Sequence, residues 1–554
     1  MKKVLGTLLV LSAASIAVAK EVNIKFLGTS DIHGRIVPWN YGADIEDKSG
    51  SYAQISTYVK EVRQNNKNVV LVDIGDAIQD NQVEVFAKTK KYYKDNPVPK
   101  VLNEMKYDYF ILGNHEFNFG MTALNEIIKD INAKVLTANF YYKKDGKRYV
   151  TATDIIEKDG VKLGLIGLTT PMSATFEKDT HHLDEMKFSS PSEEAKAQIA
   201  ELKAKGVDAI IVLAHMGIDN ENNIPDTGVA DLVNNVEGID VIIAGHMHKN
   251  IPAETIKNTL ITEPHRYGTV VSEVDLAFDV ADDGKVKLLS KNAKTVPVKA
   301  LASDPAIEKI YQPYHDELRR LNNVKIGETA QTMIPQGKNH GVAIAFTQDT
   351  GLSSLINDVQ QHYSKADVVS FAFDHQTVRL DKGDIKKKDI IYNYRYAGGD
   401  VSVYEVTGKQ LKAYMNWSAD YFDTIQPQDK DYRINEKRGK SKYVTFDIFG
   451  GVKFNIDLRK PSGEKIVDLS LANGTAITDD SKIKLGMNSY RYEQLIKKGG
   501  VWEGQQIPVI WESKVAMGSE AGTIQNMMID YISNVKKGKV EGVSHNRWKI
   551  VGLE

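Results

Sequence analysis

Cysteine is absent from this chain of 554 residues, which excludes disulfide bonds, zinc–thiolate sites, thiol nucleophiles and a lipidated amino-terminal cysteine. The chain also has no excess of one charge sign: it contains 71 Lys and Arg residues and 73 Asp and Glu residues, which gives a formal net charge of −2. No basic block occurs either, so we expect no nucleic-acid polymer as a partner. Beyond residue 19 no apolar run is long enough to cross a bilayer, and we therefore expect no membrane span.

The amino terminus has the pattern of a targeting segment. Two lysines precede the apolar residues 4–18, and this stretch ends in the small-residue sequence Ala17-Val18-Ala19. This order is typical of a secretory signal peptide that is cleaved after Ala19. The alternative, a membrane anchor, is disfavoured because the stretch is shorter than the ~20 residues that a span needs. We expect residues 1–19 to be a signal peptide and the mature protein to be exported, to the periplasm or the extracellular space.

The first half contains five short apolar runs, each followed by side chains that can bind a divalent metal. The runs, which begin at positions 24, 69, 109, 210 and 241, are typical of buried parallel strands. Open α/β sheets place their chemistry at the carboxyl ends of such strands. The polar segments that follow are Asp31-Ile32-His33, Gly75-Asp76, Gly113-Asn114-His115-Glu116, Ala214-His215 and Gly245-His246-Met247-His248. We therefore expect two Asp, one Asn and five His residues at one edge of one sheet, which favours a two-metal hydrolase.

The length of the chain indicates more than one domain. Residues 20–300 alternate strand and helix patterns, which predicts a layered α/β domain. Residues 301–323 include a charged amphipathic segment opened by Ser303-Asp304-Pro305, and we expect a connector helix there. The alternative is a peripheral helix of the first domain. Residues 324–554 mix helical and strand-like stretches and are expected to form a second domain.

Each metal-binding motif is weak alone, because a single histidine after a strand is usually structural. The five motifs in this order, each at a strand end, resemble the calcineurin-like metallophosphoesterase family. The resemblance covers the whole first domain and implies a four-layer αββα fold that binds two divalent metal ions. The family's usual metals are manganese, zinc, iron or cobalt, and Asp, Asn and His ligands do not select among them.

The resemblance also implies a role for each residue of the motifs. The implied ligands are Asp31, His33 and His248 for one ion, Asn114, His215 and His246 for the other, and Asp76 as a bridge between them. His115 is implied to be catalytic rather than a ligand: it would reach the scissile phosphate, stabilise its developing charge and assist the leaving oxygen. The resemblance to 5′-nucleotidases implies an aspartate where this chain has Asn118. An aspartate could orient and charge-balance His115, whereas an amide can only form a hydrogen bond to it.

The second half resembles the carboxyl-terminal domain of the secreted 5′-nucleotidase family, which implies an α+β fold. The resemblance is carried by residues 405–415, residues 446–457 and Asn488-Ser489-Tyr490-Arg491. In that family two aromatic rings enclose the nucleobase, and such stacking contributes ~1–3 kcal/mol per base. The substrate-binding residues that the resemblance implies are Tyr394, Asn488, Tyr490 and Arg491, with Tyr396 as a competitor of Tyr394 for the base.

The nearer likeness is to the bacterial 2′,3′-cyclic-nucleotide 2′-phosphodiesterase/3′-nucleotidase branch, because Asn118 and the segment from Ser370 to Asp374 depart from simple 5′-nucleotidases. This likeness implies an exported metal-dependent hydrolase that opens 2′,3′-cyclic nucleotides to 3′-nucleotides and dephosphorylates these to nucleosides. One alternative is a 5′-nucleotidase or nucleotide-sugar hydrolase. Another, from a different class, is a catalytically inert nucleoside-binding surface protein. The partners expected in each case are small nucleotides and nucleosides, and the sequence indicates no oligomeric state.

Overall fold

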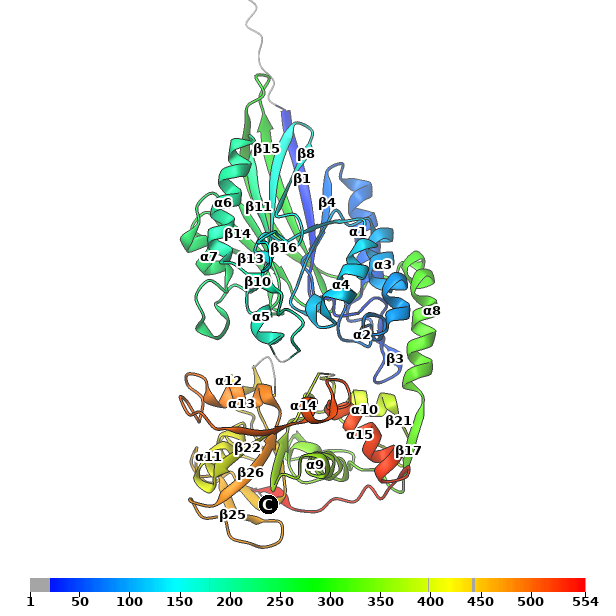
Figure 1. The fold of residues 1–554 in the computed structure, drawn as a ribbon, viewed down its shortest axis with the longest axis vertical. Coiled ribbons are helices and arrows are strands. Elements are labelled where there is room, and N and C mark those ends of the chain that lie inside the picture. The colour runs from blue at the N-terminus through cyan, green and yellow to red at the C-terminus, as the bar shows by residue number, and fades with distance from the viewer. Residues whose placement is uncertain (1–19, 179, 397, 441–443, 554) are drawn as a thin grey trace, which may run out of the picture. The chain divides into compact units, whose positions relative to one another are not determined.

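The computed structural model describes residues 20–178, 180–396, 398–440 and 444–553, so the expected signal peptide lies outside the described residues. The chain forms two compact units (Figure 1). Among the described residues, unit 1 is built from residues 20–39 and 46–314, and unit 2 from residues 40–45 and 315–553. Helix α8 (Pro305–Asn322) contains the position at which the chain leaves unit 1 for the last time.

Two six-stranded sheets form the centre of unit 1, with the strand orders β16-β15-β1-β4-β5-β6 and β13-β14-β12-β11-β9-β8. Side chains alternate between the two faces of a strand, so every second residue of β1 and β9 points between the sheets. Ile24 and Phe26 of β1 and Leu163 and Leu165 of β9 accordingly share one buried apolar cluster. The strands of the first sheet are β1 (Lys20–Thr29), β4 (Val69–Asp73), β5 (Tyr109–Ile111), β6 (Lys134–Leu136), β15 (Val270–Val280) and β16 (Val286–Pro297). Those of the second are β8 (Thr153–Lys158), β9 (Val161–Thr169), β11 (Ala209–His215), β12 (Val241–Ala244), β13 (Asn250–Ile256) and β14 (Thr259–Pro264).

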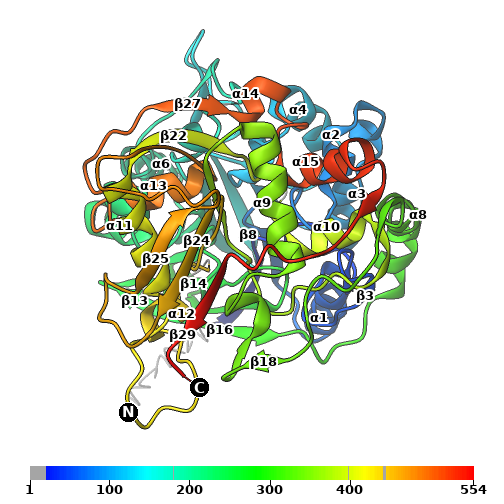
Figure 2. The ribbon, with the colours of Figure 1, turned by 90° about the horizontal axis from the view of Figure 1, so that it is seen from below.

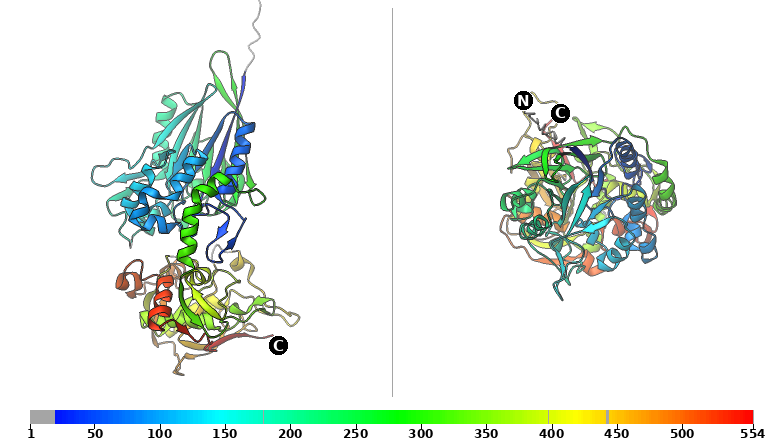
Figure 3. Two further views of the ribbon diagram at one scale, coloured as in Figure 1. Left: turned by 90° about the vertical axis from the view of Figure 1, so that its right-hand side faces the viewer. Right: turned by 90° about the horizontal axis from the view of Figure 1, so that it is seen from above.

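Helices cover the outer faces of both sheets (Figures 1 and 3). On the second sheet, Ile199 and Leu202 of α6 and Leu232 of α7 share a buried cluster with Ile210 and Val212 of β11. The helices that flank the sheets are α1 (Tyr52–Asn65), α3 (Pro97–Met105) and α4 (Gly120–Lys129) on one side, and α6 (Pro191–Ala204) and α7 (Val229–Asn235) on the other. The expected four-layer αββα order is confirmed.

Serine side chains set the starts of two of these helices. Ser51 accepts a hydrogen bond from the backbone N–H of Gln54 at the start of α1. Ser190 accepts one from Glu193 at the start of α6, where Pro191 occupies the first turn. Both satisfy backbone donors that the helix itself leaves unpaired.

Unit 2 is an α+β structure, as expected. Its largest sheet has the order β23-β20-β26-β22-β27, in which β26 runs parallel to β20 and antiparallel to β22. Helix α9 (Gly351–Ser364) begins at a capping box formed by Thr350 and Ser353, and it lies against this sheet (Figure 2). The strands of the sheet are β20 (Val368–Phe371), β22 (Ser402–Thr407), β23 (Ile448–Gly450), β26 (Lys482–Met487) and β27 (Val509–Glu512). Other helices are α10 (Lys387–Asn393), α11 (Gly408–Ala419), α13 (Ser489–Ile496) and α15 (Ile524–Asp530). Among the described helices, none is both long enough and apolar enough to cross a membrane.

Residues 40–45 belong to unit 2, although their neighbours in sequence on both sides belong to unit 1. Asp44 accepts hydrogen bonds from Arg319 Nε (2.8 Å) and Asn323 Nδ2 (3.2 Å), and Lys388 Nζ lies 3.3 Å from it. Although burial acts in the opposite direction, these donors hold the pKa of Asp44 well below its usual range. The segment is therefore fastened to unit 2 by a charged cluster.

Candidate metal centre

The candidate ligands follow strands of both sheets of unit 1. β1, β4 and β5 are parallel neighbours in the first sheet, and β11 and β12 are parallel neighbours in the second. The first sheet carries Asp31, His33, Asp76, Asn114 and His115, and the second carries His215, His246 and His248. The expectation that a single sheet carries all of them is therefore wrong. Because the sheets pack face to face, the carboxyl ends of their parallel strands meet, and the ligands converge there.

Asp31, His33 and His248 form the first group of potential ligands, and their ligand atoms lie within 4.8 Å of one another. His248 Nε2 lies 3.3 Å from Asp31 Oδ1, and the Nε2 atoms of His33 and His248 face each other across 3.0 Å. Asp31 Oδ1 is buried and has no hydrogen-bond partner among the described residues. If His33 and His248 shared a proton between their Nε2 atoms, Asp31 Oδ1 would remain without a hydrogen bond. A cation would instead bind both Nε2 atoms and Asp31 Oδ1. This donor set therefore fits a divalent metal.

Asp76, His215 and His246 form a second group that meets the same distance limit. His215 Nε2 lies 3.1 Å from Asp76 Oδ2 and 3.2 Å from Asn114 Oδ1. Asp76 Oδ2 is also 3.9 Å from His33 Nε2 of the first group. Together with His33 and His115, Asp76 forms a third group of potential ligands that overlaps the other two. Asp76 thus lies between the first and the second group, which is the position expected for a bridge.

The second ring nitrogen of several candidate ligands is also engaged. A metal-binding histidine usually donates this N–H to an oxygen, which fixes the ring and its tautomer. The pairs observed are His33 Nδ1 with Gln79 Oε1 (3.1 Å), His215 Nδ1 with the carbonyl of Ile74 (2.7 Å) and His246 Nε2 with Glu221 Oε2 (2.7 Å). For His33 and His215 this leaves Nε2 to face the ligand group, and for His246 it leaves Nδ1.

Electrostatics in the centre favour ionised carboxylates. Although burial disfavours charge, neighbouring imidazoles hold the pKa of Asp31 and of Asp76 well below the usual range. Burial also disfavours a charged imidazole, yet the Asp76 carboxylate raises the pKa of His215 to about 10. A proton on His215 thus offsets the charge of Asp76, and a metal cation would displace this proton on binding.

His115 differs from the candidate ligands in its exposure. Its side chain is 28% exposed, against 4% for His33 and 0% for His215. Its backbone N–H donates to Asp76 Oδ1 (2.8 Å), and its Nε2 lies 4.0 Å from Asp76 Oδ2. His115 therefore lies beside the shared carboxylate and can reach a solvent-borne molecule there.

Glu116 supports the centre, a role that its place in the Gly-Asn-His-Glu motif did not reveal. Its carboxylate accepts from the backbone N–H groups of Asp76 (2.7 Å), Ala77 (2.8 Å) and Gly113 (2.7 Å). Burial first, and then the charge of Asp76, raises the pKa of Glu116 to about 7. The side chain ties the loop after β4 to the loop after β5.

Gly75 and Gly113 directly precede the candidate ligands Asp76 and Asn114, because the loops after β4 and β5 are in close contact there. A Cβ on Gly113 would lie 2.2 Å from Asp76 Oδ1 and 2.8 Å from His215 Cε1. A Cβ on Gly75, whose φ is +98°, would lie 2.4 Å from the backbone nitrogen of Gly113. Neither position has room for a side chain.

Five of the candidate ligands have a strained backbone conformation. The backbone angle φ is positive at Asp31 (53°), His33 (47°), Asp76 (60°), His246 (75°) and His248 (57°). Non-glycine residues in sparsely populated backbone conformations cost about 1–3 kcal/mol each and cluster at functional sites. Hydrogen bonds between the loops, from Asp31 N to the carbonyl of Gly75 and from His33 N to the carbonyl of Asp76 (both 2.9 Å), hold this geometry.

The substrate-binding residues implied for unit 2 lie near one another but differ in availability. Asn488 caps α13 through the backbone N–H of Tyr490 (3.0 Å) and donates to Asp400 Oδ1 (2.9 Å). Arg491 is buried and pairs with Asp447 Oδ2 (2.8 Å). Tyr490 is 42% exposed. Asn488 and Arg491 are therefore engaged in holding the local structure, and Tyr490 presents its ring.

The two tyrosines that compete for the second base contact also differ. Tyr394 packs against the core of unit 2, and burial raises the pKa of its hydroxyl, to which the charge of Asp400 adds. Tyr396 is 56% exposed. Tyr396 thus offers more ring surface to a ligand.

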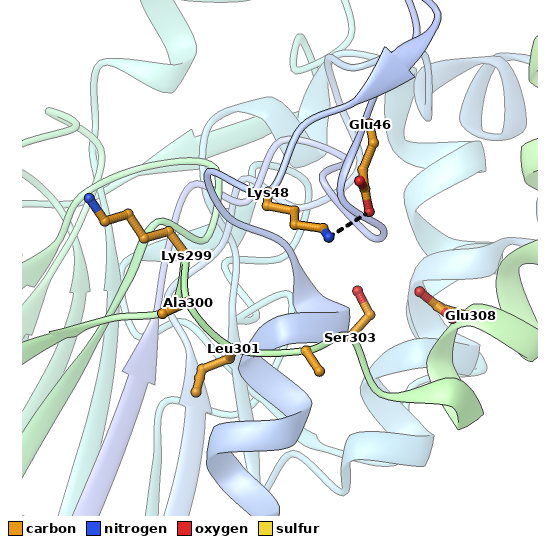
Figure 4. Close-up of a pocket in the computed structure, with 8 residues that line it drawn as sticks. Glu46, Lys48, Lys299, Ala300, Leu301, Ser303 and Glu308 are labelled. Atoms are coloured by element: carbon orange, nitrogen blue, oxygen red, sulfur yellow. Dashed lines mark ion pairs between the residues drawn. The ribbon is translucent and has the colours of Figure 1, made fainter.

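A surface pocket of about 420 Å³ in unit 1 shares no residue with the candidate centre (Figure 4). Lys48 pairs with Glu46 across it (3.2 Å), whereas Lys299 points away. The lining is completed by Ala300, Leu301, Ala302, Ser303 and Glu308. These residues form no cluster of metal-binding or nucleophilic groups, and we assign no chemistry to the pocket.

Comparisons with known proteins agree with this architecture. Residues 24–250 match the profile of the calcineurin-like phosphoesterases, and residues 325–496 match that of the 5′-nucleotidase C-terminal domain. The trifunctional nucleotide phosphoesterase protein YfkN of Bacillus subtilis is 25% identical over 96% of this chain, which spans only 39% of that protein. A 2′,3′-cyclic-nucleotide 2′-phosphodiesterase/3′-nucleotidase of Haemophilus influenzae is 26% identical over 99% of this chain and 91% of its own length.

A solved structure supports the fold as a whole. The crystal structure of a putative 5′-nucleotidase from Staphylococcus aureus, in complex with α-ketoglutarate, superposes with a TM-score of 0.74 at 21% identity. The match covers 96% of this chain and 100% of the other. With one profile in each half of its sequence, this chain joins a calcineurin-like phosphoesterase domain to a 5′-nucleotidase C-terminal domain.

Proposed function

We propose that this protein opens 2′,3′-cyclic nucleotides to 3′-nucleotides and then dephosphorylates these to nucleosides. The observation that carries the proposal is the convergence of a shared buried carboxylate, Asp76, with two groups of potential ligands and an exposed histidine, His115. The name of the Haemophilus relative, which is matched over nearly its full length, supports the choice of substrate.

We assign the ions to the residues as follows: Asp31, His33 and His248 hold one, Asn114, His215 and His246 hold the other, and Asp76 touches both. When bound, two divalent cations polarise a phosphoryl oxygen and let water act as a nucleophile near neutral pH. His115 reaches the phosphate from the solvent side, where its imidazole stabilises developing charge and gives a proton to the leaving ribose oxygen. The same residues serve both steps, because each step breaks a bond between phosphorus and a ribose oxygen.

We further propose that unit 2 binds the nucleobase through the exposed ring of Tyr490, with Tyr396 or Tyr394 as the second ring. Asn488 and Arg491 contribute by holding the start of α13, from which Tyr490 projects. Stacking tolerates different bases, because every base has a π-face. We therefore expect little preference among bases.

A substrate panel tests this function. We expect purified protein with Mn²⁺ to release phosphate from 3′-AMP, and to convert 2′,3′-cyclic AMP to adenosine with transient 3′-AMP. The Asp76→Asn variant, prepared in parallel, controls for contaminating phosphatases. Release from 5′-AMP alone would contradict the proposal and favour a 5′-nucleotidase.

We also propose export through the amino-terminal residues 1–19. Mass spectrometry of protein produced in a bacterium with its own leader should find a chain that begins at Lys20. A chain that retains residues 1–19 in the cytoplasm would contradict export.

A further inference from the structure

His115 is hydrogen-bonded to a neutral partner that is itself bound to a carboxylate. His115 Nδ1 lies 2.7 Å from Asn118 Oδ1, and Asn118 Nδ2 donates to Glu177 Oε1 at 2.5 Å. Glu177 is 59 positions away in the sequence and comes from the loop that follows α5 (Ser173–Phe176). A chain of hydrogen bonds therefore runs from the candidate catalytic histidine to a buried acid.

The carboxylate determines which way the amide faces. An ionised carboxylate only accepts hydrogen bonds, so Asn118 must turn its NH₂ group to Glu177 and its carbonyl oxygen to His115. The carbonyl also only accepts, so His115 must carry a proton on Nδ1. Without Glu177 the amide could turn over, and Nδ1 would then accept a hydrogen bond instead.

The surroundings of Glu177 keep it ionised and in place. Its side chain is 3% exposed, and its Oε2 accepts from Thr180 Oγ1 (2.6 Å) and faces His182 Nδ1 (3.0 Å). Burial alone would raise its pKa, but hydrogen bonds from His182, Thr180 and Asn118 keep the pKa of Glu177 below its usual value. The negative charge is thus fixed on the far side of the amide from His115.

We propose that Glu177 is a positioning residue for His115, acting through Asn118. Where the resemblance to 5′-nucleotidases implies an aspartate, this chain carries Asn118, and Glu177 supplies a negative charge one hydrogen bond further away. Glu177 fixes the orientation of the amide and, through it, the His115 tautomer with Nδ1 protonated, so that Nε2 stays on the side of Asp76. The inference rests on the function proposed for His115.

The test compares proteins that carry a carboxylate at position 177, at position 118, at both positions or at neither. The four proteins are the wild type, Glu177→Gln, Asn118→Asp and the double variant. Turnover of phenyl phosphate with Mn²⁺ reports on the metal centre, whichever nucleotide is the substrate, and its basic phenolate leaving group requires the proton that His115 gives. We expect Glu177→Gln to lower kcat roughly 10- to 100-fold, the usual effect of removing a supporting partner, with KM and metal content nearly unchanged. Asn118→Asp alone should also lose activity, because it places two carboxylates side by side.

The double variant decides between positioning and simple structural support. We expect it to regain most of the activity that Glu177→Gln loses, since the new carboxylate at position 118 would face His115 directly while the new amide at position 177 donates to it. Equal effects of Asn118→Asp in both backgrounds would show no coupling and would overturn the inference. If Glu177→Gln does not fold, the comparison of Asn118→Asp with the double variant decides alone: a more active double variant supports the inference, and an equal or less active one overturns it.

Three further measurements separate the possible failures. Glu194→Gln is the matched control, because Glu194 likewise accepts from three donors, Tyr141, Arg148 and Ser189; it should leave kcat unchanged. Nitrogen-15 NMR of the metal-free, histidine-labelled protein should show Nδ1 of His115 protonated in the wild type and less so in Glu177→Gln, and an unchanged tautomer would overturn the inference. If His115→Ala keeps full activity, the role proposed for His115 fails instead.

Discussion

At the scale of single residues, the candidate metal centre contains buried charged side chains, such as Asp76, and one partly exposed side chain, His115, that can contact a substrate. Asp76 is 1% exposed and lies between two groups of potential ligands. His115 touches the same carboxylate but keeps a solvent-facing edge. Burial and contact thus predict different consequences for the loss of each.

We expect His115→Ala to lower kcat by about 10²–10⁴-fold, the usual contribution of a general acid, while metal content stays at the wild-type level. Asp76→Asn should instead lose bound metal, because it removes the negative charge that both groups share. Elemental analysis together with steady-state kinetics measures both effects. Loss of metal from His115→Ala would make this histidine a ligand and contradict its assignment.

The candidate site residues that could be predicted from the sequence are those that closely follow the end of a strand. Asp31, Asp76, His215 and their companions could be found because strand ends are readable from apolar runs. Glu177 and Glu221 could not, since each lies in a loop whose path only the folded chain reveals. Nor could an apolar run show to which of two sheets its strand belongs, and for this reason one sheet was expected where two are present.

At the scale of elements, the loops after β4 and β5 are packed so closely that only glycine fits directly before the candidate ligand in each, at Gly75 and at Gly113. The absent side chain of Gly113 leaves the space that Asp76 and His215 occupy. The loops are therefore one structure, although Gly113 and Asp76 are 37 positions apart in the sequence.

We expect Gly113→Ala to displace Asp76 or His215, and to reduce metal binding and kcat at least 10-fold, because a misplacement of about 1 Å can cost 10²-fold in rate. Gly164→Ala, in the buried strand β9, is the control: its Cβ would meet methyl groups of Ile210 and Leu202 at 3.0 Å, which can shift. Metal titration and circular dichroism distinguish a displaced ligand from an unfolded chain. Normal metal affinity in Gly113→Ala would contradict this close packing of the loops.

At the scale of the whole molecule, each unit has an apolar core of its own. Among the described residues, the cluster between the sheets of unit 1 and the cluster on the outer face of its second sheet share no member with the large cluster of unit 2. All candidate metal ligands belong to unit 1. Binding of metal should therefore stabilise one unit directly.

We expect calorimetry to resolve two unfolding transitions, of which only one moves upward when Mn²⁺ is added. A ligand at 100 times its Kd adds about 2.7 kcal/mol to the stability of the unit that binds it. Addition of EDTA should return that transition to its starting temperature and abolish activity. An equal shift of both transitions would show that the units unfold together.

The charged cluster around Asp44 has a consequence for anyone who divides this protein into fragments. A single cut between Tyr314 and His315 would leave Asp44 on the first fragment, and Arg319, Asn323 and Lys388 on the second would lose the carboxylate that they share. A second fragment that preserves the cluster around Asp44 has to include residues 40–45, for example joined to its amino terminus through a linker. The boundary between the halves is thus discontinuous along the sequence, and one scission of the chain does not reproduce it.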